Sequence, residues 1–404
     1  MLENLIKFRD VSKVFSILQE QGGESRFVGG CVRNILCNKE INDLDIATTL
    51  RPEQVELAFK SQGIKTINIG KDHGTIVVVL NSYSYEITTL RRDVSTDGRR
   101  AVVEYSDNWE EDALRRDFTI NAMSYCPYNN QLYDYFNGVA DLKKGIIRFV
   151  GDPEQRVQED YLRILRFFRF YTYCGTDAID KASLNACIKY SQKIHSLSAE
   201  RKFYEFYKIL EHKDYLRSIK IMLDNKILDH LFEHRINENT LDYLSKLKEL
   251  SVLNNCSLDQ PLLRLFILTD FNKITIESLV SIFNLPNKHI SYLKSLKKNY
   301  ALGIDKIKND LYKFIYEDRE GLIDSLLCIV LKEDLNKHNI ISEVRKYINK
   351  SIEFPLGGNE IMKIFHITEG KEVGAFLGKG LDFWYKSKFT ADKQEIIQYL
   401  KGLR

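Results

Sequence analysis

The sequence has few of the features that mark membrane-embedded or secreted proteins. No stretch approaches the ~20 consecutive apolar residues of a membrane span, and runs such as Thr75–Leu80 have the length of a strand. Residues 1–7 lack the long apolar segment of a signal peptide. The seven cysteines form no Cys-x-x-Cys pair, so neither a zinc site nor a disulfide framework is expected. We therefore expect reduced thiols, a cytoplasmic location and no association with membranes.

Proline, repeats and excess charge are also scarce. The chain of 404 residues has six prolines and contains neither an internal repeat nor a low-complexity tract. Its length is typical of about two to four modules. The formal net charge is only +3, from 59 basic and 56 acidic residues. Composition therefore permits nucleic-acid binding without showing it, because such binding depends on a local basic stripe.

The pattern of the sequence changes near residue 150. The strands expected before that point are Ser25–Val28, Asp43–Ala47, Gly74–Leu80 and Tyr83–Leu90, the last two forming a hairpin, and the expected helix is Cys31–Asn38. From Asp152 onward the pattern is helical. The first helix has Asp152 as its N-cap and Pro153 in its first turn, and is expected to continue through Arg166. The fold class is therefore α+β, with a small mixed head followed by a long helical part.

Asp43 and Asp45 flank Leu44 in one of the expected strands. Because side chains alternate along a strand, the two carboxylates share a face while Leu44 is buried behind them. Such carboxylates repel each other unless a cation lies between them, and Mg²⁺ prefers oxygen ligands. Asp43 and Asp45 are therefore predicted to be catalytic and to bind metal. Taken alone, the same pattern also fits a solvated turn.

A glycine pair precedes the two aspartates. The strand that ends at Val28 leads into Gly29 and Gly30, and Arg33 lies on the first turn of the helix that follows. Glycines let a backbone approach a phosphate closely, and a helix N-terminus offers free N–H groups. A glycine pair alone could be a plain turn. Its position shortly before Asp43 favours a triphosphate site formed by Gly29, Gly30 and Arg33.

Glu86 lies in the strand Tyr83–Leu90 and is predicted as a third catalytic carboxylate. An exposed glutamate at the edge of a sheet would give the same pattern. The segment that follows, residues 91–100, combines charged residues with Gly98. This composition is typical of a mobile or solvated surface loop.

Four motifs in order resemble those of class II tRNA nucleotidyltransferases and bacterial poly(A) polymerases. They are Gly29–Arg33 with Asp43–Thr48, Arg115–Ala122, Glu159–Arg163 and Ser198–Arg201. The resemblance implies a polymerase-β-like nucleotidyltransferase head followed by an all-α neck, body and tail. The expected parts are a catalytic head at 1–148, a neck that recognises the base at 149–205, a body at 206–300 and a tail that binds tRNA at 301–404.

The resemblance also implies which residues contact the nucleotide. These are Arg116, Asp117 and Asn121 in the second motif and Asp160, Arg163 and Arg166 in and after the third. On a continuous helix, Asp160 and Arg163 would share one face. A carboxylate accepts and a guanidinium donates, so together they could satisfy the Watson–Crick edge of cytosine or adenine. An ordinary surface ion pair between them is the alternative.

Two positions depart from the family pattern. Asn34 stands where aspartate is usual, and Tyr161 stands where a small residue or proline is common. Tyr161 is expected to change how the neck helix packs against the head. The loop at residues 91–100 corresponds to one that helps family members to switch from cytosine to adenine addition. Its presence favours synthesis of the complete CCA end.

The predicted function is the template-independent addition of CCA to the 3′ end of tRNA from CTP and ATP with Mg²⁺. The RNA 3′-hydroxyl would attack the α-phosphate and release pyrophosphate. We expect tRNA to bind through its 3′ end, acceptor arm and elbow, and no protein partner is indicated. A poly(A) polymerase, or an enzyme that adds only part of CCA, shares every motif. A catalytically silent RNA-binding protein is the alternative from another class.

Overall fold

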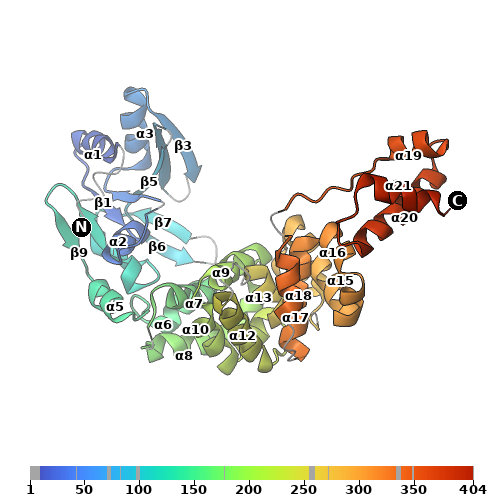
Figure 1. Ribbon diagram of the computed structural model, residues 1–404. Coiled ribbons are helices and arrows are strands. Elements are labelled where there is room, and N and C mark those ends of the chain that lie inside the picture. Colours follow the sequence, from blue (N-terminus) through green and yellow to red (C-terminus); the bar gives the residue numbers. More distant parts are fainter. Residues whose placement is uncertain are drawn as a thin grey trace. The chain divides into compact units, whose positions relative to one another are not determined.

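The computed structural model describes residues 10–41, 43–70, 74–81, 83–96, 101–176, 178–253, 260–271, 273–333, 338–347 and 350–403. The chain divides into two compact units, Met1–Arg235 and Ile236–Arg404 (Figure 1). The finer borders expected at residues 148, 205 and 300 stay predictions. None of the helices in the described ranges has the length and apolar character needed to cross a membrane.

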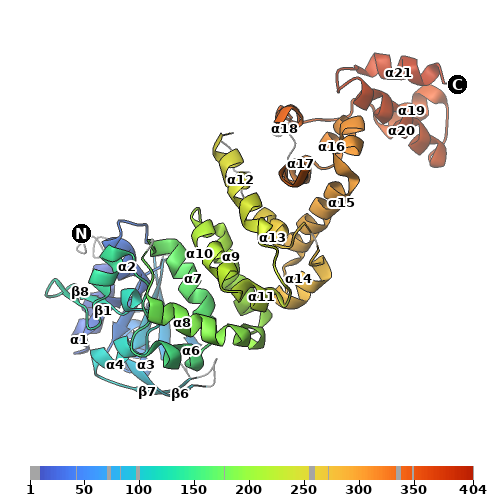
Figure 2. The ribbon, with the colours of Figure 1, turned by 90° about the horizontal axis from the view of Figure 1, so that it is seen from below.

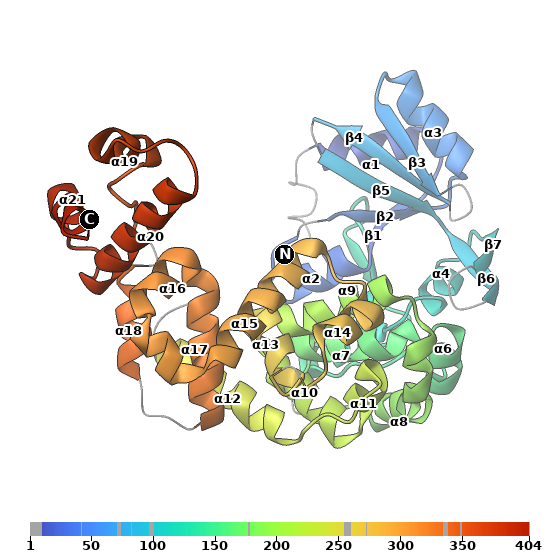
Figure 3. The same cartoon turned by 90° about the vertical axis from the view of Figure 1, so that its right-hand side faces the viewer.

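The first unit contains a mixed sheet of seven strands in the order β3-β4-β5-β2-β1-β8-β9. Figure 3 labels the strands β1 to β5 of this sheet. β2 and β5 run parallel, and the other neighbouring strands are antiparallel. The strands are β1 (Ser25–Val28), β2 (Asp45–Thr48), β3 (Lys65–Gly70), β4 (Thr75–Leu80), β5 (Tyr83–Thr89), β8 (Ser124–Cys126) and β9 (Gln131–Tyr133). The α+β prediction and the β4–β5 hairpin are therefore confirmed, but β2 begins two residues later than expected.

Helices pack on one face of this sheet and leave the functional side chains on the other. The helices of the head are α1 (Val11–Glu20), α2 (Gly30–Leu36), α3 (Pro52–Ser61), α4 (Trp109–Leu114) and α5 (Gly138–Lys144), with the short 3₁₀ helix η3 (Thr119–Asn121). The main apolar core joins α1, α2 and α3 to inward side chains such as Phe27, Ile46 and Ile87. Their strand neighbours point to the opposite face, where Ala47 packs with Trp109.

The segment expected as a mobile loop is largely a strand pair. β6 (Arg91–Thr96) and β7 (Ala101–Tyr105) form a two-stranded antiparallel ribbon. β-branched residues on both segments, such as Val94 and Val103, suit a strand better than a loop. The loop prediction for residues 91–100 is therefore wrong for Arg91–Thr96, which forms β6. Its centre, residues 97–100 with Gly98, lies outside the described residues.

The neck helices follow the head in the same compact unit (Figure 2). They are α6 (Pro153–Glu159), α7 (Leu162–Cys174), α8 (Lys181–Tyr190), η4 (Ser191–Ser196), α9 (Ala199–Glu211), α10 (Tyr215–Asp224) and α11 (Ile227–Phe232). As expected, the Asp152 carboxylate accepts a hydrogen bond from the N–H of Gln155 and caps α6. Phe118 and Phe149 of the head stack at 4.9 Å and contact Phe167 and Phe170 of α7. This buried aromatic cluster fixes α7 to the head.

In its described ranges, the second unit consists of helices without strands. They are α12 (Asn239–Leu253), α13 (Pro261–Leu268), α14 (Ile276–Phe283), α15 (Asn287–Asn309), α16 (Leu311–Glu317), α17 (Arg319–Glu333), α18 (His338–Arg345), α19 (Gly358–Phe365), α20 (Lys371–Lys386) and α21 (Lys393–Lys401). α15 is kinked at Gly303, whose φ of 73° a helix does not accommodate. The last three helices share a core around Trp384 and Phe365. The expectation of an all-α second part is confirmed.

Candidate active site

The glycine turn connects β1 to the N-terminus of α2. Gly29 has φ 68° and ψ −124°, a conformation that other residues rarely adopt. A Cβ at Gly29 would lie 3.2 Å from Nη1 of Arg116 and 3.9 Å from Oδ2 of Asp45. Glycine is therefore required here both by the backbone and by the close approach of these side chains. The turn places the start of α2 directly beside an aspartate and an arginine.

Asp43 and Asp45 lie on the same side of their segment, as the alternation predicts. Leu44 between them is buried in the apolar core. Both aspartates line a cleft of about 400 Å³ that Gly30 and Arg33 also line. Asp45 is the first residue of β2, whereas Asp43 precedes the strand and is exposed. The structure therefore brings the acidic pair and the glycine turn together.

Glu86 faces Asp45 from the neighbouring strand. The two residues are in register in the parallel pair of β2 and β5. Tyr85 and Ile87 on either side of Glu86 belong to the main core, so Glu86 points to the opposite face together with Asp45. Burial raises the pKa of Asp45, and the nearby charges of Glu86 and Asp43 raise that pKa further. The charges of Asp43, Asp45 and Glu86 therefore repel one another, and a cation beside them would reduce this repulsion.

The carboxylates of Asp43 and Asp45 suit a divalent cation that also binds the substrate. In the described part of the chain, no three His, Cys, Asp or Glu side chains converge closely enough to hold an ion unaided. Mg²⁺ is commonly held by one or two carboxylates together with the phosphate oxygens of a substrate. Asp43 and Asp45 supply such a pair beside the glycine turn. The carboxylates present therefore suit a metal that arrives with a nucleotide.

Arg33 is held by neutral partners. Its Nη1 donates to Oδ1 of Asn121 at 2.5 Å, and its Nη2 donates to Oδ1 of Asn34 at 2.8 Å. Among the described residues, no carboxylate lies within ion-pair distance of this guanidinium. Its charge is therefore available to a phosphate at the cleft. Asn34, where the family usually has aspartate, serves here to orient Arg33.

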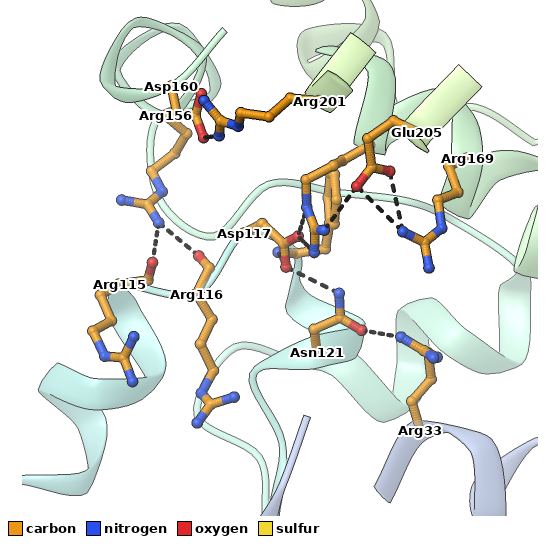
Figure 4. Close-up of polar contacts among 12 residues, drawn as sticks. Arg33, Arg115, Arg116, Asp117, Asn121, Arg156, Asp160, Arg169, Arg201 and Glu205 are labelled. Atoms are coloured by element: carbon orange, nitrogen blue, oxygen red, sulfur yellow. Dashed lines mark hydrogen bonds and ion pairs between the residues drawn. The ribbon is translucent and has the colours of Figure 1, made fainter. Parts of the chain in front are cut away.

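Asp117 is the centre of a buried polar network (Figure 4). Its carboxylate accepts hydrogen bonds from Asn121 at 2.9 Å and from two nitrogens of Arg166 at 2.8 and 2.6 Å. Burial alone would raise the pKa of Asp117, but Arg166 and Asn121 outweigh it and lower the pKa to about 2. Arg166 continues the network to Glu205 on α9, which also pairs with Arg169. Asp117 and Arg166 are thus primarily partners of each other.

Arg115 and Arg116 share one acidic partner on α4. The Asp112 carboxylate lies 2.7 Å from Nη2 of Arg115 and 3.0 Å from Nη2 of Arg116. Burial opposes ionisation of Asp112, but the two guanidinium groups outweigh that effect and lower its pKa. Arg115 is therefore engaged by an acidic residue of the same head. Arg116 differs because its Nη1 also reaches the glycine turn.

The prediction that Asp160 and Arg163 lie on one continuous helix is wrong. α6 ends at Glu159, Asp160 has an extended backbone, and α7 begins at Leu162. The Asp160 carboxylate accepts a hydrogen bond from the N–H of Leu162 at 3.1 Å. A short acidic side chain that bonds the main chain two residues further on competes with the helical backbone in this way, and the resulting turn separates α6 from α7.

Asp160 and Arg163 therefore have separate partners. Asp160 forms an ion pair of 2.7 Å with Arg201 on α9, and Arg163 forms one of 2.6 Å with Glu159. Tyr161, the other departure from the family pattern, lies in the break, and its ring is 6.4 Å from that of Tyr190 on α8. The surface-pair alternative for Asp160 and Arg163 is not what the structure shows either.

The sequence analysis missed several residues that hold or line the site. Nη2 of Arg156 donates to the main-chain oxygens of Arg115 and Arg116 at 2.6 and 2.7 Å and so fixes the second motif from α6 (Figure 4). Besides Cys31 and Asn34 of α2, the remaining lining of the cleft comes from α7 and from α9 with the residue after it, namely Arg169, Phe170, Tyr173, Lys208, Glu211 and His212. Arg201 belongs to the fourth motif, Ser198–Arg201, so the sequence could have identified it as a site residue. Arg156 and Glu205 carry no local signal.

A glycine turn, a guanidinium without an acidic partner and a carboxylate pair are groups that can bind a nucleoside triphosphate. On a mixed sheet, followed by helices that carry the motifs Glu159–Arg163 and Ser198–Arg201, this combination is the one expected for a nucleotidyltransferase. The comparison with known proteins agrees. Residues 25–148 match the model of the Poly A polymerase head domain. Residues 178–238 match that of a probable RNA and SrmB-binding site of polymerase A.

Relatives cover almost the whole chain. The mitochondrial CCA tRNA nucleotidyltransferase 1 of Mus musculus is 34% identical over 95% of this chain and 88% of its own length. The CCA-adding enzyme of Streptococcus pyogenes serotype M5 is 31% identical over 92% of this chain and 91% of its own length. A crystal structure of the Bacillus stearothermophilus CCA-adding enzyme in complex with CTP shares the fold, with a TM-score of 0.73 at 23% identity, covering 98% of this chain and 97% of that chain. The chain belongs to the family of CCA-adding tRNA nucleotidyltransferases, which are generally metal-dependent.

Proposed function

We propose that this protein adds CCA to the 3′ end of tRNA from CTP and ATP without a nucleic-acid template. The observation that carries the proposal is the shared cleft of Asp43, Asp45, Gly30 and Arg33. It combines groups for a triphosphate with a carboxylate pair at one place. The relatives support the choice of tRNA and of CCA as product, since their names state that activity.

In the proposed reaction, the RNA 3′-hydroxyl attacks the α-phosphorus and the bond to the β-phosphate breaks, so that pyrophosphate leaves. Asp43 and Asp45 would hold Mg²⁺, which lowers the pKa of the attacking hydroxyl and neutralises phosphate charge when bound. The N–H groups at Gly29 and Gly30 and the Arg33 guanidinium bind the triphosphate and stabilise the leaving group. Glu86 increases the negative potential at Asp45 and so the affinity for the cation.

We propose that Asp160 and Arg163 select the base, although they do not lie on one continuous helix. Asp160 pairs with Arg201, and Arg163 pairs with Glu159. The Asp160 carboxylate, an acceptor, and the Arg163 guanidinium, a donor, therefore lie at the same end of α7. Cytosine and adenine both offer an amino donor and a ring acceptor that can pair with such groups. Guanine and uracil would leave buried polar groups unpaired, at a cost of roughly 1–3 kcal/mol each. Asn121, which contacts Arg33 and Asp117, and Arg116, which reaches Gly29, are proposed to contact the ribose.

The cytoplasm is the proposed location. The six described cysteines are all free thiols, which fits a reducing compartment.

One assay tests the proposed activity. The protein is incubated with tRNA that lacks its CCA end and with radiolabelled CTP or ATP, and the products are separated on a sequencing gel. Addition of two C residues and one A supports CCA synthesis. A long ladder of A supports a poly(A) polymerase, incomplete addition supports a partial enzyme, and no extension in the presence of tRNA binding supports a silent RNA-binding protein.

A further inference from the structure

Two cysteines that are distant in the sequence meet where α2 and α7 end. Cys37 directly follows the last residue of α2, and Cys174 is the last residue of α7. Their thiols lie close enough together to shift each other's pKa in opposite directions. Both are half-buried and line a cavity of about 400 Å³ next to the active-site cleft. They differ in this from Cys187, which is buried in the core of the neck.

Independent contacts hold these two helix ends together. Nζ of Lys39 donates to the main-chain oxygen of Tyr173 at 2.6 Å and lies 3.3 Å from the centre of its ring. The Tyr173 hydroxyl reaches Oδ1 of Asn34 at 3.5 Å. The proximity of Cys37 and Cys174 is therefore a consequence of packed elements on both sides, and it does not depend on the sulfurs alone.

We propose that Cys37 and Cys174 are a site of reversible oxidation, at which a disulfide fastens α2 to α7 and slows nucleotide addition. The second half of this inference rests on the proposed function. The oxidant is of the hydroperoxide class. The Cys37 thiolate attacks one peroxide oxygen, which gives a sulfenic acid and releases hydroxide. The Cys174 thiol then attacks the Cys37 sulfur, forming the S–S bond and releasing water.

The surroundings suit this order of steps. The Cys174 thiol lowers the pKa of Cys37, and the nearby charges of Lys39 and Arg33 lower it further, against the effect of burial. The Cys37 thiol, together with burial, raises the pKa of Cys174. Cys37 is therefore the thiolate and Cys174 the resolving thiol. The cavity they line gives a small peroxide access.

The bond would alter the active site through α2. To form the bond, the two sulfurs must approach to about 2.05 Å with a dihedral angle near 90°. This movement pulls the end of α2, where Asn34 lies one turn before Cys37 and orients Arg33. A displacement of about 1 Å in a group that positions substrate can reduce the rate by on the order of 10²-fold. We expect at least a tenfold loss of activity.

The test uses the full-length protein, first reduced and then freed of reductant. It is treated with hydrogen peroxide, and free thiols are blocked with N-ethylmaleimide before digestion and mass spectrometry. A linked peptide pair containing Cys37 and Cys174 is expected in the wild type and in Cys187→Ala, the matched control. Its absence in both overturns the site, whatever the protein's activity proves to be.

The same samples are then assayed for nucleotide addition. The wild type is expected to lose at least tenfold in rate after peroxide and to recover with dithiothreitol, whereas Cys37→Ser and Cys174→Ser keep their rates. A crosslink that forms without changing the rate overturns the coupling to catalysis. Equal loss in Cys174→Ser and the wild type also overturns it, because sulfenic acid formation alone would then explain the effect.

Discussion

Asp45 of β2 and Glu86 of β5 lie opposite each other in register across a parallel strand pair. Both point away from the main apolar core, and the charge of Glu86 raises the pKa of Asp45. Natural sheets rarely place like charges side by side, because the repulsion is destabilising. Arg116 and Arg33 oppose this repulsion at Asp45, and a divalent cation at the pair would oppose it further.

Glu86→Gln keeps the shape of the side chain and removes its charge. We expect kcat to fall and the Mg²⁺ concentration for half-maximal activity to rise, each by about 10-fold to 100-fold, as for residues that support a metal ligand. Steady-state rates over a Mg²⁺ titration measure both. Ser84→Ala, on the same face of β5, is the matched control. Equal behaviour of the two variants would show that Glu86 is an ordinary exposed residue of the sheet.

Asp43→Asn removes one carboxylate of the pair. We expect nucleotide addition to fall by roughly 10³-fold or more, because charge that develops at the phosphate is no longer stabilised. Affinity for tRNA, measured by filter binding, should be unchanged. Asp107→Asn is the control, since Asp107 is 73% exposed and pairs only with Arg51 among the ion pairs described. Loss of tRNA binding in Asp43→Asn alone would assign Asp43 to the RNA site instead.

Arg201→Ala removes the partner that holds the Asp160 carboxylate. We expect the preference for CTP over UTP, measured as a ratio of kcat/KM values, to fall about tenfold, which corresponds to about 1.4 kcal/mol. The rate with CTP should change less than this ratio. Lys189→Ala breaks an exposed ion pair of the neck with Glu154 and serves as the control. Undiminished discrimination in Arg201→Ala would remove Asp160 from the proposed base-reading set.

Asp117→Asn should destabilise the first unit. The pKa of Asp117 is lowered from 3.8 to about 2, a shift that corresponds to about 2 kcal/mol of stability. Because the pKa of the folded state is the lower one, this contribution is present above pH 4 and is lost as the pH falls toward 2. Urea unfolding should therefore separate the variant from the wild type by about 2 kcal/mol at pH 7, by roughly half as much at pH 3, and by little at pH 2. A constant difference would mean that packing, and not charge, accounts for the loss.

Much of the fold could be predicted because local signals agree with the tertiary structure. β1 was predicted at its observed bounds, and Asp152 with Pro153 marked the start of α6. The break at Asp160 was missed because the pattern of apolar residues continues through it. An aspartate inside a helical pattern can instead form a local turn with the main chain, and the hydrogen bond from the N–H of Leu162 shows that Asp160 does so here.

The candidate site was predictable where it depends on short segments. Gly29, Asp43 and Asp45 interact across a single turn and two adjacent strands, so spacing alone locates them. The supporting residues were not predictable in this way. Arg156 and Glu205 reach the site from helices whose positions follow from tertiary packing, and their neighbours in sequence contain no motif for it.

The buried network around Asp117 has a consequence for how this sequence can evolve. It links Arg33 on α2 through Asn121 and Arg166 to Glu205 on α9. Residues in one hydrogen-bonded network interact energetically, so the effects of substitutions at Asn121 and Glu205 should not add. Whether a substitution at one residue of the network is tolerated then depends on which residues occupy the other positions. Divergence at these positions is expected to occur in compensated pairs, which makes them a region of strong epistasis.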